Sequence, residues 1–278
     1  MNIISKAFQF FNVISLNVVF GAVISSIMFW KLPDGNGSLN EASLILLGLC
    51  TWIIYILDRI LDLRIYPENK SKRHLFHSDH QYNLSVLLIV LVLLAGVLCF
   101  FIPSPIFKYG LVLSIVLAVY FLILNKVLKN KKMQWVKEPT TAICYCLAVI
   151  GIAFVDQSSI NSSGWILAFM FFLIVSQNLL TFSYFENISK SSQVNSVTLF
   201  GERNTLRIIR FLGFVVLFLA IFLFSSGWDY VNKVGLVLAV MSQVLSFLPA
   251  RVTYFSINDR YRWLGDGVFV LPALLLIF

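Results

Sequence analysis

The chain has 278 residues, of which 59% are hydrophobic and 12% are charged, and it carries a net charge of +8. Soluble domains contain about a quarter charged residues, so this composition excludes an ordinary soluble protein and predicts a polytopic membrane protein. The stretches between the apolar runs are too short for a separate soluble domain. We therefore expect one membrane domain over residues 1–278.

Apolar runs of about 20 residues cross a bilayer as helices, and the sequence contains nine such runs. The first run shows no small-residue cleavage site, so we interpret it as a span and not as a removed signal peptide. The nine runs predict an all-α, polytopic bundle of about nine transmembrane helices. They cover residues 8–30, 41–61, 83–102, 106–125, 139–155, 163–183, 208–225, 232–250 and 263–278.

The basic residues alternate along the chain. When each loop is numbered by the run that it follows, the even loops hold 17 of the 21 Lys and Arg residues, and Lys6 falls on the same side. The positive-inside rule then places the amino terminus and the even loops in the cytoplasm, as in a bacterial-type inner or plasma membrane. This distribution explains the positive charge without a nucleic-acid partner.

Two acidic residues, Asp58 and Asp62, lie one helical turn apart at the end of the second apolar run. Side chains at i and i+4 project from one face of a helix, and an ionised carboxylate is costly in hydrocarbon. A hard divalent cation between them would relieve their repulsion, and Mg²⁺ bound in this way commonly also holds a diphosphate. The alternative is that Arg59 pairs with Asp62 and the cluster only marks the helix end.

A basic group, Lys70, Lys72 and Arg73, follows Asp62 closely. Lys and Arg supply the cations that the remaining oxygens of a metal-held diphosphate need. The same group also fits a juxtamembrane patch that touches anionic lipid. Of the five lysines between 126 and 137, Lys137 is best placed to reach inward, because it stands at the start of the fifth run.

The end of the sixth run carries Tyr184, Glu186 and Asn187, with Asn178 about two turns deeper. The amide could bond between helices or line a polar path beneath a site. In the ninth run, Arg262 at i−4 is the simplest partner for Asp266. His74, His77 and His80 recur every three residues, but they have no acidic partner at zinc spacing, so we interpret them as surface or phosphate-neighbouring residues.

Together these features resemble the UbiA-type intramembrane prenyltransferase superfamily over nearly the whole chain. That family has an Asn-Asp-x-x-Asp-x-x-x-Asp motif after helix 2, and Asp58 and Asp62 match its last two acids, with Ile54 and Tyr55 at the Asn-Asp positions. The Arg/Lys-rich stretch that follows is similar to residues 70–73. A Thr-Leu-x-x-x-x-Gly-like segment after the second motif is similar to residues 196–201.

Aligning Thr198 and Gly201 with that segment puts the second-motif acids at Asn187 and Ser191, which leaves Glu186 as the nearest carboxylate. The resemblance implies nine helices with a cytoplasmic cap, and Mg²⁺ that binds an isoprenyl diphosphate. The allylic cation would then alkylate an aromatic or lipid acceptor. By this resemblance the catalytic and metal-binding residues are Asp58, Asp62 and Glu186, and the substrate-binding residues are Lys70, Lys72, Arg73, Lys137, Asn178, Tyr184 and Asn187.

Two other functions stay open at the level of sequence. A membrane terpene cyclase on the same scaffold would ionise the diphosphate but use no acceptor. A non-enzymatic protein that binds lipid or a partner would keep the helices after losing the second acidic motif. The leading expectation is a divergent, Mg²⁺-dependent membrane prenyltransferase.

Overall fold

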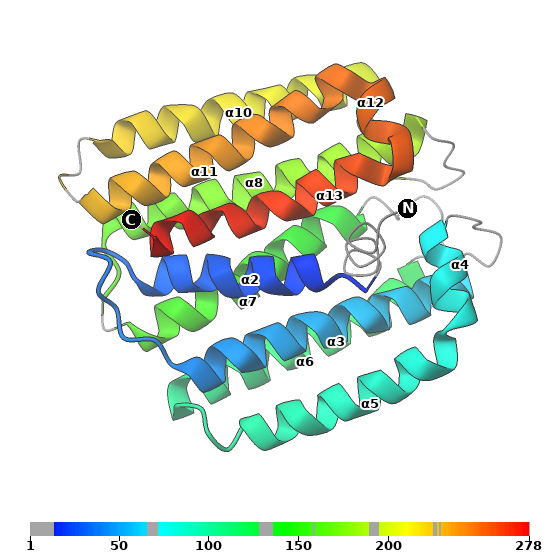
Figure 1. Ribbon diagram of the computed structural model, residues 1–278, viewed down its shortest axis with the longest axis horizontal. Coiled ribbons are helices and arrows are strands. Elements are labelled where there is room, and N and C mark those ends of the chain that lie inside the picture. The colour runs from blue at the N-terminus through cyan, green and yellow to red at the C-terminus, as the bar shows by residue number, and fades with distance from the viewer. Residues whose placement is uncertain are drawn as a thin grey trace.

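The computed structural model describes residues 14–65, 72–127, 136–157, 159–188, 195–224, 227 and 229–277. Within these ranges every regular element is a helix. The helices run side by side along the molecule, with α10 and α11 at one side, α3, α5 and α6 at the other, and α2, α7, α8 and α13 between them (Figure 1). The all-α bundle predicted from the sequence is therefore present.

In the described ranges, eight helices form the body of the bundle, and shorter helical segments connect or extend them. The eight are α2 (Leu16–Trp30), α3 (Glu41–Ile65), α5 (Gln81–Leu98), α6 (Ser104–Val127), α7 (Lys137–Asp156), α8 (Ser162–Ile188), α10 (Glu202–Leu223) and α11 (Asp229–Phe247). The shorter segments are α4 (Lys72–Asp79), α9 (Ser196–Phe200), η3 (Leu248–Arg251), α12 (Val252–Ser256), η4 (Ile257–Asp259), α13 (Arg260–Gly267) and η5 (Val268–Leu276).

By length and composition, 7 helical segments of the described chain are able to cross a membrane. One of them, Asp229–Leu276, is 48 residues long and contains two of the predicted spans, because α11 and the α13–η5 segment are joined by short helical turns. Helix α2 is apolar but has only 15 described residues. The structure thus supports a multi-pass membrane protein, while the exact count of nine spans and the cytoplasmic cap remain predictions.

A buried amide joins three helices on the α10–α11 side. Gln177 of α8 is fully buried, and its Nε2 donates to the carbonyl of Ile209 at 3.0 Å and to Ser246 Oγ at 2.8 Å. Its Oε1 accepts from Ser242 Oγ at 2.7 Å. In hydrocarbon such bonds between helices are worth about 0.6–2 kcal/mol each. Gln177 therefore fixes α8 against α10 and α11.

Helices α3 and α5 pack around a small apolar cluster of their own, made of Ile56, Ile60, Leu84 and Leu91. The larger core, which includes Phe29, Phe171 and Phe185, lies among α2, α7, α8, α10 and α11. The end of α3 and the short helix α4 lie at one end of the bundle, which we call the α4 end (Figure 1). Most of the polar side chains discussed below lie at or near this end.

Candidate functional site

The start of α7 connects α3 to α8 at the α4 end. Lys137, the first residue of α7, reaches α3, where its Nζ lies 3.0 Å from Asp58 Oδ1. Both side chains are partly buried, with exposed fractions of 29% and 24%. The predicted inward reach of Lys137 thus ends on the first of the two predicted aspartates.

The next residue, Glu138, turns toward α8 and α9. Its carboxylate accepts hydrogen bonds from the hydroxyls of Ser183 and Ser196 and from the backbone N–H of Ser196, the last at 3.3 Å. Asn195 holds the two serines close together, because its Oδ1 caps the start of α9, where Ser196 lies, and its Nδ2 donates to the Ser183 carbonyl at 3.3 Å. Two adjacent residues of α7 therefore join the ends of α3 and α8.

The carboxylate of Glu186, at the end of α8, forms an ion pair with Arg262 of α13. Aromatic rings surround the pair: the Arg262 guanidinium lies 5.4 Å from the centroid of the Phe182 ring, and Tyr261 stacks on Phe185 at 4.6 Å. A guanidinium over an aromatic face gains cation–π attraction. Arg262 therefore binds Glu186 of α8, whereas the sequence had suggested Asp266, one turn along α13, as its simplest partner.

The other predicted site residues fall into two groups. Asn187 Nδ2 donates to Glu202 Oε1 of α10 at 2.9 Å, so its amide binds α10 and not Asp58. Tyr184 is buried, with its ring edge-on to that of Phe185. Asn178 lies deeper, against Gly265 of α13. Outside the described residues lie Lys70 and the side chains of Asp62, Lys72 and Arg73.

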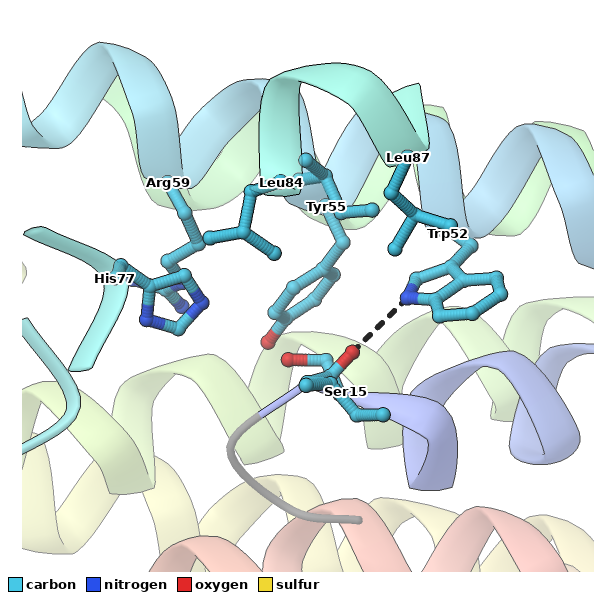
Figure 2. Close-up of a pocket in the computed structure, with 9 residues that line it drawn as sticks. Ser15, Trp52, Tyr55, Arg59, His77, Leu84 and Leu87 are labelled. Atoms are coloured by element: carbon cyan, nitrogen blue, oxygen red, sulfur yellow. Dashed lines mark hydrogen bonds between the residues drawn. The ribbon is translucent and has the colours of Figure 1, made fainter. Parts of the chain in front are cut away.

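A small pocket lies beside the site, between the start of α2 and helices α3, α4 and α5 (Figure 2). Its volume is ≈ 10 Å³, room for about one water molecule. Arg59, Tyr55 and His77 point into it, and Trp52 Nε1 donates to the carbonyl of Ile14 at 3.0 Å (Figure 2). His77 is only 4% exposed, so one histidine of the predicted surface set is buried where α4 packs on α3.

The carboxylates that the structure describes at this end of the bundle do not by themselves form a magnesium site. Asp58 contacts the ammonium of Lys137, and Glu186 contacts the guanidinium of Arg262. Over the described ranges, no three His, Cys, Asp or Glu side chains gather in a way that could hold a metal. The Mg²⁺ prediction depends on Asp62, whose side chain lies outside the described residues.

Sequence reasoning missed the roles of Glu138, Ser183, Ser196 and Arg262. Glu138 was given no role in the sequence analysis, and its serine partners lie 45 and 58 residues away along the chain. The one available signal in the sequence was a carboxylate at the start of an apolar run, because a carboxylate that is buried there needs hydrogen-bond donors from elsewhere in the chain. The partners themselves depend on how α7, α8 and α9 pack.

No family model matches the chain, and no curated protein and no solved structure matches it. The resemblance to UbiA-type prenyltransferases therefore rests only on the sequence features quoted above. Any function has to be argued from the site itself.

The Arg262–Glu186 pair gives a prediction about stability. Replacing Arg262 with Met leaves the Glu186 carboxylate in an aromatic setting without its cation, and replacing Glu186 with Gln removes the acceptor of Arg262. Because both side chains are partly exposed, each change is expected to cost about 1–2 kcal/mol of unfolding free energy. The double variant is expected to lose less than the two single losses together. Thermal unfolding in detergent measures all three, and additive losses would contradict the pairing.

Proposed function

We propose that the protein is a divergent membrane prenyltransferase that transfers an isoprenyl group from an isoprenyl diphosphate to an aromatic or lipid acceptor. One observation carries the proposal: the start of α7 brings together the end of α3, with Asp58, and the end of α8, with Glu186 nearby. These are the two helix ends at which the resemblance expects the diphosphate. We further propose that this end faces the cytoplasm, as the distribution of basic residues predicts.

In this proposal Lys137 and Arg262 hold the leaving diphosphate. Each is a cation set partly inside the bundle, and cations placed where charge develops stabilise a departing anion more strongly at low dielectric than in water. Asp58 and Glu186 position these two side chains before the substrate binds. On binding, diphosphate oxygens replace the carboxylates as their partners. Lys70, Lys72 and Arg73 would add positive charge from α4 and the segment before it.

Magnesium remains a prediction that rests on Asp58 and Asp62. When bound, it would supply positive charge to the diphosphate oxygens. In this proposal the described residues that bind the diphosphate are Lys137 and Arg262. Their ion pairs with Asp58 and Glu186 involve no metal. A magnesium requirement is therefore best measured and not assumed.

The decisive experiment adds geranylgeranyl diphosphate to the purified protein in detergent, with Mg²⁺ and with EDTA. We expect the melting temperature to rise on adding the diphosphate and inorganic diphosphate to be released, with geranylgeraniol as the matched control that lacks the anion and gives neither response. If neither response occurs with geranyl, farnesyl or geranylgeranyl diphosphate, the enzymatic proposal is wrong.

A non-enzymatic protein of the same fold is the second candidate, and one observation favours it. Asp58 and Glu186 already have cationic partners, so the site is satisfied without a ligand. This candidate predicts no change in melting temperature with any isoprenyl diphosphate. A terpene cyclase would instead release diphosphate without an acceptor and yield a cyclic hydrocarbon, which product analysis distinguishes from prenyl transfer.

A further inference from the structure

A second polar cluster lies deeper in the bundle than the candidate site, where α2, α7, α8 and α13 meet. Asp266 of α13 stands one helical turn beyond Arg262 and is 8% exposed. Its Oδ2 accepts a hydrogen bond from Asn17 Nδ2 of α2 at 3.2 Å. An ionisable residue inside an apolar bundle is costly, and such residues usually have a function.

Three buried oxygen atoms on α2, α7 and α8 have no hydrogen-bond partner within the described part of the chain: Asn17 Oδ1, the Tyr145 hydroxyl and Asn178 Oδ1. Asn17 is the residue that bonds Asp266. Asn178 is 6% exposed, and its Oδ1 lies against Gly265, next to Asp266. Tyr145 of α7 packs edge-on against Phe269, which stands three residues after Asp266, with ring centroids 5.8 Å apart.

Buried polar atoms without partners are rare in native proteins, and each one calls for an explanation such as a bound ion or water. Here all three orphaned atoms are neutral oxygens, two from amides and one from a phenol, and their residues contact Asp266 itself, its neighbour Gly265, and Phe269 on the same segment. Oxygen sets of this kind coordinate hard cations, and in membrane proteins carbonyl and carboxylate oxygens coordinate Na⁺.

We propose that Asp266, Asn17, Asn178 and Tyr145 form a binding site for a small monovalent cation, best matched by Na⁺. Asp266 supplies the negative charge, and the two asparagines and the tyrosine supply neutral oxygens from three other helices. Mg²⁺ and Ca²⁺ fit less well, because their sites usually contain more carboxylates or keep several waters. The site is separate from the diphosphate site proposed above and does not depend on it. The bound ion ties α2, α7, α8 and α13 together.

The test is the melting temperature of the purified protein in detergent at fixed pH, as NaCl replaces choline chloride at constant ionic strength. Between 5 and 200 mM Na⁺ we expect a saturable rise of about 2–4 °C, as binding to the folded state alone produces. Asp266→Asn is expected to abolish the rise, and Asn178→Leu to reduce it to less than half. Asp156→Asn is the matched control and is expected to keep the full sodium response. Asp156 also accepts a hydrogen bond from a neutral donor, Trp30 Nε1 at 3.1 Å, but it is the last residue of α7 and lies away from Tyr145.

A wild-type melting temperature that does not respond to Na⁺, or an equal rise in Asp266→Asn, would overturn the proposal and leave buried water as the partner of these oxygens. If Asp266→Asn fails to fold, the Asn178→Leu variant still decides. If Asn178 does not bind sodium, its replacement by Leu leaves the sodium response unchanged. If Asn178 is a ligand, the replacement weakens the response. Broadening of the ²³Na resonance by the wild-type protein, and its loss in Asn178→Leu, gives an independent measurement.

Discussion

Replacing Asp58 with Asn is expected to lower the rate of diphosphate release from an isoprenyl diphosphate by less than the roughly 10²–10³-fold that removing a donor to the developing charge costs, because Asp58 only positions that donor. The substitution keeps the size of the side chain but removes the charge that holds Lys137 Nζ at 3.0 Å. Lys137 then loses its fixed position before the substrate arrives. Asp58→Glu retains the charge and is expected to recover part of the rate.

The matched control is a second Asp–Lys pair elsewhere in the chain. Lys233 Nζ lies 2.8 Å from Asp229 Oδ2 one helical turn away, and the aspartate side chain is 82% exposed. Exposed pairs of this kind contribute little, so Asp229→Asn is expected to leave diphosphate release and melting temperature unchanged. An Asp58→Asn variant as active as the wild type would show that the α3–α7 contact has no part in the chemistry.

Replacing Gly265 with Ala is expected to cost about 1–3 kcal/mol of unfolding free energy, the range found for overpacked cores. A Cβ at this position would lie 2.4 Å from Phe182 Cε1 and 2.5 Å from Asn178 Oδ1, so both side chains of α8 must move or α13 must move away from α8. Movement of α13 also carries Arg262 away from Glu186. Activity is therefore expected to fall along with the melting temperature.

Gly267, two residues further along α13, provides the comparison. A Cβ there meets nothing within 4 Å, and Ala is favoured over Gly in a helix by about 1 kcal/mol. Gly267→Ala is therefore expected to leave the melting temperature unchanged or raise it slightly. Equal effects at the two positions would mean that the contact between α8 and α13 is looser than described.

The helical class and the positions of most helices could be predicted from the sequence, because apolar runs of membrane length leave few alternatives. The run at 41–61 becomes a helix that continues to Ile65 and carries Asp58 to its end. The ninth run is less regular than its composition suggested: it consists of the eight-residue helix α13 followed by the 3-10 segment η5, with Pro272 inside. Proline removes a backbone donor, and hydropathy does not register that change.

The candidate site could be predicted only in part. The acidic pair and Lys137 were visible because charge is rare in such a sequence. The serines that bind Glu138, and the pairing of Arg262 with Glu186 over 76 residues, were not visible. These contacts depend on which helix faces cross, and a single sequence does not record that. The cluster that contains Asp266 could not be predicted for the same reason, because the four residues that supply its oxygen atoms lie on four different helices.

The separate apolar cluster of α3 and α5 has a consequence for how the molecule can move. The start of α3 is held in the larger core by Leu44 and Leu47, whereas Ile56 and Ile60 near its α4 end belong to the small cluster with α5. A small displacement of the α4 end of α3 together with α5 therefore leaves the larger core intact. Asp58 lies on this part of α3, so its salt bridge to Lys137 limits how far this end of the helix can move away from α7.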